Sequence, residues 1–103
     1  MYTDSAIEKL VAKSLAATIV KRRKELNLSQ EKVAYGASLD RSHYQVIEAG
    51  IGNRKTLTPA NPRLSTLLHL AIALDCSLLD LLKETSELFE RYRKAAKSMQ
   101  NQA

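Results

Sequence analysis

LSQEKVAYGASLDRSHYQVIEAG, residues 28–50, is the most informative stretch of the chain. Its residues predict two short helices joined by a tight turn over about residues 30–49. Ser29 is a good N-cap for the first helix, because its hydroxyl can accept a hydrogen bond from a free backbone N–H of the first turn. Asp40 can cap the second helix, over about 40–49, in the same way. Gly50 is suited to end that helix.

The corner between these two helices is unusual. Corners of this kind require a left-handed backbone at one residue, a conformation that glycine adopts without strain. Ser38 stands at that position, and Gly36 precedes it by two residues. Two alternatives stay open: Ser38 holds the left-handed conformation, or Gly36 ends the first helix early and the turn is built otherwise.

The second helix of the pair has two different faces. The interior positions of the pair are all apolar or aromatic, namely Val33, Ala37, Leu39, Tyr44 and Ile47. Arginine can pair bidentately with guanine and glutamine with adenine in the DNA major groove, and an apolar side chain can touch a thymine methyl. The outer face therefore predicts base contacts by Arg41, Ser42, Gln45 and Val46, which follow helical spacing. The alternative is a structural corner that binds no DNA.

The rest of the chain favours helices as well. Only 3 glycines and 2 prolines occur in 103 residues, which predicts an all-α fold. We expect a long first helix over about residues 5–26, capped by Ser5, and a long loop at 51–60. Asn61 and Pro62 are expected to cap and begin a fourth helix, and SLLD at 77–80 to open a fifth. One domain then covers 1–103, with a core of about 15–82 and a C-terminal helix over about 83–99.

The charge of the chain points to a polyanionic partner. The net charge is +5 and the sequence pI about 9.5. Ten basic and six acidic residues lie in 1–55, whereas 75–90 holds five acids and one lysine, so the fifth helix should point away from a nucleic acid. Contacts to a DNA backbone are expected from His43, Asn53, Arg54 and Lys55. Packing or simple solvation is the alternative for these side chains.

The stretch 28–50 resembles the helix-turn-helix of the phage repressor/Cro-like (Xre) transcriptional regulators. NPRLSTLLHLAIALDCSLLDLL, residues 61–82, resembles the fourth and fifth helices of the same domain. The sequence LDRSHYQVIEAG is most similar to that of the controller proteins of restriction–modification systems, and small antitoxins share much of it. Two departures are the serine at 38, where the family commonly has a glycine, and a longer loop after Gly50.

The resemblance implies a five-helix, lambda-repressor-like DNA-binding domain that acts as a homodimer on a palindromic operator. One recognition helix from each subunit would lie in successive major grooves. It also implies base contacts by Arg41, Ser42 and Gln45 and a phosphate contact by Arg23. Gln30 would bind a phosphate or support a base-contacting side chain, and Glu48 would be structural.

The C-terminal helix carries a wide apolar stripe that needs a surface to cover. We expect a dimer interface that includes Leu81, Leu88, Phe89 and Tyr92. The alternative is packing within one chain, against early turns of the first helix such as Ile7 and Leu10.

The most economical function is a sequence-specific regulator that binds double-stranded DNA and represses or autoregulates a promoter. Activation through RNA polymerase stays open, and the rival is an antitoxin that masks a toxin. No residue set suggests an enzyme, a cofactor or a metal site, because the chain has 2 histidines and only Cys76 as a thiol. No signal peptide or long apolar run occurs, so we expect a cytoplasmic protein without a membrane segment.

Overall fold

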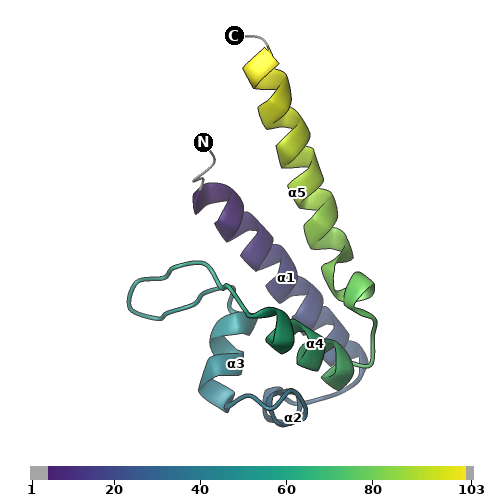
Figure 1. Cartoon of the computed structure of the whole chain (residues 1–103). Coiled ribbons are helices and arrows are strands. Elements are labelled where there is room, and N and C mark those ends of the chain that lie inside the picture. The colour runs from purple at the N-terminus through teal and green to yellow at the C-terminus, as the bar shows by residue number, and fades with distance from the viewer. Residues whose placement is uncertain (1–4, 102–103) are drawn as a thin grey trace.

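The computed structural model describes residues 5–101. Five helices follow one another in this part of the chain: α1 (Ser5–Glu25), α2 (Gln30–Gly36), α3 (Arg41–Glu48), α4 (Leu64–Ala73) and α5 (Leu78–Asn101). Figure 1 shows α2, α3 and α4 gathered around the C-terminal end of α1, while α5 runs back along α1 and extends past it. The prediction of an all-α fold with long first and last helices is confirmed.

Side chains cap three of the helices where the sequence predicts it. Ser29 Oγ accepts a hydrogen bond from the backbone N–H of Lys32 at 3.1 Å. Asp40 Oδ1 accepts one from the N–H of His43 at 2.8 Å. At the start of α5, the N–H of Asp80 donates to Ser77 Oγ at 2.9 Å and the N–H of Ser77 donates to Asp80 Oδ2 at 3.4 Å. The side chain of Ser5, the expected cap of α1, lies outside the described part.

The predicted start of the fourth helix was wrong by two residues. Its N-cap is Arg63, which makes no side-chain cap bond, and the helix begins at Leu64 instead of Pro62. The cause lies in the preceding loop, where Ile51 pairs with Pro59 and the N–H of Ala60 donates to the Gly50 carbonyl at 3.1 Å. This pairing holds the chain extended as it leaves the loop, so the helix starts later.

The first four helices end in the same kind of corner. The second residue after the end of each helix has a positive φ: Asn27 (57°), Ser38 (57°), Gly50 (77°) and Asp75 (49°). In the α2 corner, the N–H of Leu39 donates to the Ala34 carbonyl at 2.9 Å and that of Ser38 to the Tyr35 carbonyl at 3.1 Å. This pair of bonds is the Schellman motif, and the other three corners repeat it. Ser38 therefore holds the left-handed conformation.

Gly36 serves a different purpose from the one considered for it. It is the last residue of α2. A Cβ atom at this position would lie 3.2 Å from the Cβ of Ala73, at the end of α4. The missing side chain thus allows the ends of α2 and α4 to approach closely.

The core lies where the five helices meet. Its largest fully buried side chains come from all five helices or their immediate ends: Ile19, Val33, Tyr44, Leu70, Leu74 and Leu81. Leu81 is only 1% exposed and packs in this cluster. This burial corrects the expectation that Leu81 lies on a dimer surface, because no face of its side chain is left for a second copy.

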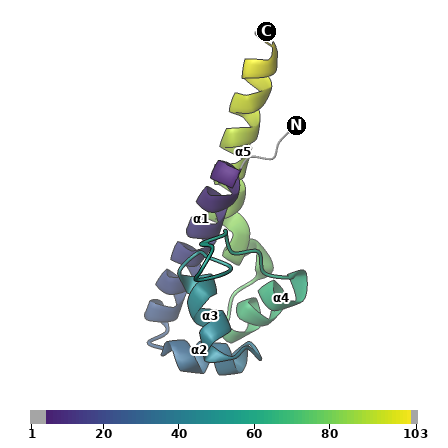
Figure 2. The same ribbon diagram turned by 90° about the vertical axis from the view of Figure 1, so that its left-hand side faces the viewer.

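α1 and α5 form an antiparallel pair that rises from the core (Figures 1 and 2). Ile7 in α1 is buried, and Thr85 Oγ1 donates to Ser14 Oγ at 3.2 Å. The C-terminal helix therefore packs on the first helix within one chain. Among the described residues, no single helix is long and apolar enough to cross a membrane, although α4 and α5 pass that test together across a 120° bend.

Candidate nucleic-acid interface

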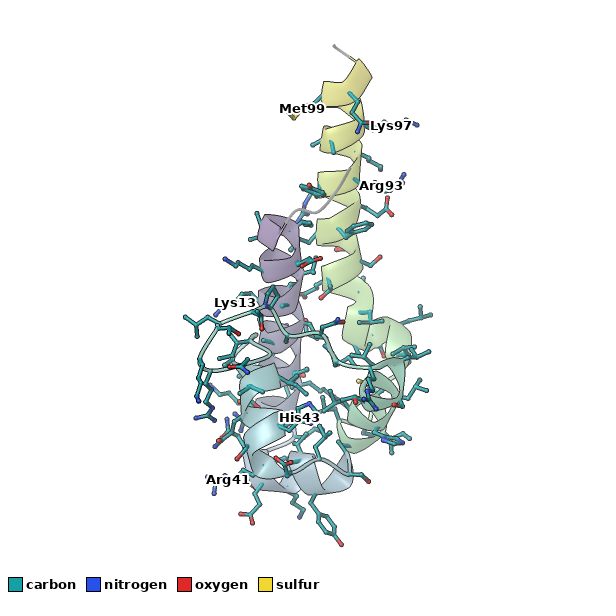
Figure 3. All side chains as sticks on the ribbon, turned by 60° about the vertical axis from the view of Figure 1, so that its left-hand side comes forward. Lys13, Arg41, His43, Arg93, Lys97 and Met99 are labelled. Atoms are coloured by element: carbon teal, nitrogen blue, oxygen red, sulfur yellow. The ribbon has the colours of Figure 1, made fainter. Side chains whose placement is uncertain are left out.

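The side chains expected to contact bases follow one another along a face of α3. Arg41 and Ser42 are exposed, and Gln45 and Val46 are half-buried. Figure 3 shows Arg41 extending away from the molecule at the start of α3. Tyr44 and Ile47 are buried in the core and anchor the helix from its other side. Base contacts by the outer face stay a prediction.

Arg23, near the end of α1, and Glu48, the last residue of α3, form a largely buried ion pair. Nε and Nη2 of Arg23 donate to Oε2 and Oε1 of Glu48 at 2.9 and 2.8 Å, and Nη1 donates to the Leu28 carbonyl at 3.0 Å. The two side chains are 15% and 6% exposed. This fork-like geometry ties α3 to α1 and gives Glu48 the structural role expected of it.

The same pair limits what Arg23 can offer a phosphate. A guanidinium carries five N–H donors, and the three bonds above use three of them. One N–H on each Nη remains. The phosphate contact expected of Arg23 stays a prediction and would have to use these two groups.

Burial and hydrogen bonding together fix the charges beside α3. Burial by itself would raise the pKa of Glu48, but hydrogen bonds from Arg23 and Gln30 help to hold that pKa below its ordinary value. The bonds to Glu48 also raise the pKa of Arg23. Burial raises the pKa of Tyr44, whose hydroxyl faces the same carboxylate without meeting it at hydrogen-bond geometry. At neutral pH the group is thus a carboxylate, a guanidinium and a neutral phenol.

A chain of side-chain hydrogen bonds leads from this carboxylate to the loop. Gln30 Nε2 donates to Glu48 Oε1 at 2.9 Å. Gln45 Nε2 donates to Gln30 Oε1 at 3.4 Å, and Arg54 Nη2 donates to Gln45 Oε1 at 3.1 Å. We call these four residues, Glu48, Gln30, Gln45 and Arg54, the amide relay. Of the two roles expected for Gln30, the relay corresponds to support of a base-contacting side chain.

The loop between α3 and α4 is held by hydrogen bonds among its own residues. Asn53 Oδ1 accepts hydrogen bonds from the N–H groups of Lys55 at 2.8 Å and Thr56 at 3.3 Å. The N–H of Gly52 donates to the Thr58 carbonyl at 2.7 Å. Lys55 and Arg54 are exposed, as is His43 on α3. Their DNA-backbone contacts, and that of Asn53, stay predictions.

Two basic side chains of α1 have roles that sequence reasoning did not find. Lys13 Nζ donates to the Ala49 carbonyl at 3.1 Å, at the C-terminal end of α3. Arg22 donates through Nε to the Leu74 carbonyl at 2.8 Å and through Nη2 to the Asp75 carbonyl at 2.7 Å. Both cations satisfy carbonyls that a helix end leaves open. One signal for Arg22 in the sequence is its position three residues after Ile19, which places both on the inner face of the helix.

Histidine, cysteine and acidic side chains are the groups from which a metal site or a reactive thiolate would be built. Within residues 5–101, no group of three histidine, cysteine or acidic side chains could hold a metal ion. Cys76 is half-buried, and burial raises the pKa of its thiol, which does not favour a reactive thiolate.

Comparison with known proteins identifies the fold. The chain resembles the crystal structure of the wild-type restriction–modification controller protein C.Esp1396I, with a TM-score of 0.60 and 21% identity over 79% of this chain and 95% of that one. A single-substitution mutant of the same controller protein gives a TM-score of 0.60 and 22% identity over the same shares. No model of a protein family and no curated protein matches the sequence.

Proposed function

We propose that the protein is a sequence-specific DNA-binding transcriptional regulator with α3 as its recognition helix. The observation that carries the proposal is the outer face of α3, where Arg41, Ser42, Gln45 and Val46 are accessible on a helix anchored by the core. Arginine and glutamine are the side chains best suited to bidentate contacts with guanine and adenine. The fold shared with a restriction–modification controller protein and the net charge of +5 support the same function.

We further propose that the protein binds as a homodimer to a palindromic operator. A dimer would present two copies of α3 to half-sites about 34 Å apart, one turn of the double helix. Occupation of its own or a neighbouring promoter would then repress transcription, and a contact with RNA polymerase is the corresponding route to activation.

The dimer needs a surface that leaves α3 free. Leu64, Leu68 and Ile72 follow one another at intervals of four residues on α4 and are 65%, 43% and 73% exposed. Leu88, Phe89 and Tyr92 form the competing surface, but part of it faces α1, where Ile7, Phe89 and Tyr92 line an apolar cleft. We therefore propose the α4 face as the dimer contact.

Selection from a pool of random duplexes at moderate salt tests the DNA-binding function. We expect a palindrome whose half-sites are one helical turn apart, because the spacing must match the two recognition helices. In the selected site, Arg41→Ala should cost about 1–3 kcal/mol and relax the choice at one base pair. A pool recovered without any sequence preference would overturn the regulator proposal.

The second candidate function is a protein-binding module of the antitoxin type. The observation in its favour is the cleft of about 180 Å³ between α1 and α5, lined by Ile7, Phe89, Tyr92 and Arg93. Its lining residues belong to α1 and α5, and Figure 1 shows the N-terminal end of α1 and the facing part of α5 at a distance from α3. A small protein that copurifies in fixed ratio, and is lost on Phe89→Ser but kept on Arg41→Ala, would establish this function.

A further inference from the structure

The hydrogen bonds of the amide relay all run in one direction, which is dictated by the chemistry of its four residues, Glu48, Gln30, Gln45 and Arg54. An ionised carboxylate such as Glu48 only accepts hydrogen bonds, and a guanidinium such as Arg54 only donates them. The two glutamines between them can each be turned by half a rotation, which exchanges their carbonyl oxygen and amide nitrogen. The charged ends decide which of these orientations is occupied.

The orientation follows step by step from Glu48. Gln30 must turn its Nε2 to the carboxylate, at 2.9 Å, so its Oε1 faces Gln45. Gln45 must then offer Nε2 to that oxygen, at 3.4 Å, which leaves its Oε1 on the other side. Arg54 Nη2 donates to this Oε1 at 3.1 Å. A reversed Gln45 would place an amide N–H against the guanidinium and a carbonyl against the oxygen of Gln30.

Arg54 provides much of this control over Gln45. The bond from Gln45 to Gln30 is long at 3.4 Å and joins two neutral amides, whereas the bond from Arg54 is shorter and has a charged donor. Without Arg54, only the weaker bond would distinguish the two orientations of Gln45. The loop that carries Arg54 is itself held in place by Asn53 and by the pairing of Ile51 with Pro59.

We propose that Arg54 is a positioning residue that sets the base preference of Gln45 by fixing the direction of its side-chain amide. The proposal rests on the DNA-binding function proposed above. With both relay bonds made, Gln45 keeps one lone pair on Oε1 and one N–H on Nε2. These are the acceptor and the donor that a bidentate contact with adenine N6 and N7 needs.

This role differs from a contact between Arg54 and a phosphate. A phosphate contact strengthens binding to every sequence alike and adds to the salt dependence. A positioning residue changes the discrimination at one base pair, the pair that Gln45 contacts. The two roles therefore separate when binding is measured on a set of duplexes that differ only at that pair.

The experiment uses the full chain and the selected site with each of the four base pairs at the Gln45 position. Gln45→Ala identifies that position, as the one pair at which it removes a preference of the parent protein. We expect the parent protein to prefer adenine there by about ten-fold or more, and Arg54→Ala to reduce this preference to about two-fold. Arg54→Lys should keep most of it, since an ammonium also only donates hydrogen bonds.

Lys55→Ala is the matched control, because it removes one positive charge from the adjacent position of the same loop. It should weaken binding to all four duplexes by the same factor. A second measurement needs no DNA: Arg54→Ala should shift and broaden the side-chain amide resonances of Gln45 in ¹⁵N spectra of the free protein, whereas Lys55→Ala should leave them in place.

Three results would overturn the inference, and they differ from failure of the proposed function. One is an Arg54→Ala variant that loses affinity equally for all four base pairs, which would make Arg54 a phosphate contact. Another is unchanged Gln45 amide resonances in that variant. The third is a Gln45→Ala variant that keeps every base preference. A parent protein without sequence preference would instead remove the DNA-binding function, and the inference with it.

Discussion

At the scale of single residues, the left-handed backbone at a helix corner is strained where the residue is not glycine. A left-handed conformation costs a residue other than glycine about 1–2 kcal/mol. Asn27 and Asp75 are residues whose short polar side chains tolerate that conformation. Serine lacks that advantage, so Ser38, with a φ of 57°, should carry the greatest backbone strain of the four corner residues.

Ser38→Gly should therefore raise the free energy of unfolding by about 0.5–1 kcal/mol, after allowance for the greater freedom of glycine in the unfolded chain. Urea denaturation followed by circular dichroism measures the change. The matched control is Ser86→Gly in the middle of α5, where the same substitution should destabilise by about 0.5 kcal/mol. A loss of stability in Ser38→Gly would show that the serine corner is not strained.

At the scale of helices, the ion pair between Arg23 and Glu48 joins α3 to α1, beside the bond from Lys13 to the Ala49 carbonyl. The folded-state pKa of Glu48 is lowered, so the charged carboxylate stabilises the fold above its ordinary pKa near 4.5. That contribution is lost as the pH falls through the lower folded-state value. Acid should therefore loosen the link between α3 and α1.

Glu48→Gln should cost about 2 kcal/mol at neutral pH, because it leaves the Arg23 charge largely buried without its partner. Below about pH 4.5 the difference from the parent protein should begin to shrink, because the unfolded parent chain then takes up a proton, and the remainder should be lost as the pH falls through the lower folded-state pKa. Urea denaturation at a series of pH values from about 7 to about 3 measures both effects. A difference in unfolding free energy that does not change with pH would contradict this account of Glu48.

The helices also show what a sequence can and cannot predict. Caps at Ser29 and Asp40 and the buried positions Val33, Tyr44 and Ile47 follow from local hydrogen-bonding chemistry and helical spacing, so they could be predicted. The late start of α4 depends on pairing between residues 51 and 59, which no local pattern displays.

The residues of the candidate site also divide into those that the sequence could predict and those that it could not. Arg41, Ser42, Gln45 and Val46 share a face through their spacing alone, and that face could be predicted. The bond between Arg54 and Gln45 depends on how a loop folds back over a helix. The loop has no periodicity, and its two ends are set by tertiary contacts. The amide relay therefore became visible only in the structure.

At the scale of the whole molecule, two apolar surfaces are candidates for the contact of the proposed dimer. α5 already covers part of α1, and the burial of Ile7 and Leu81 shows that part of its apolar stripe packs within one chain, whereas Phe89 and Met99 are 44% and 72% exposed. On α4, by contrast, Leu64 and Ile72 are more than half exposed. Large side chains at helical spacing on one exposed face are typical of a protein contact.

Ile72→Glu should therefore convert the dimer to a monomer, because two copies of a buried glutamate would face each other across a symmetric contact. Phe89→Glu is the matched control: it places the same charge on α5, on a side chain that is 44% exposed, and should leave the dimer intact. Sedimentation equilibrium gives the mass, and circular dichroism confirms that both variants keep their helices. DNA affinity should fall in Ile72→Glu and be kept in Phe89→Glu, because a monomer contacts only one half-site. The opposite pattern, with Phe89→Glu monomeric and Ile72→Glu dimeric, would transfer the interface to α5, and a monomeric parent protein would overturn the dimer altogether.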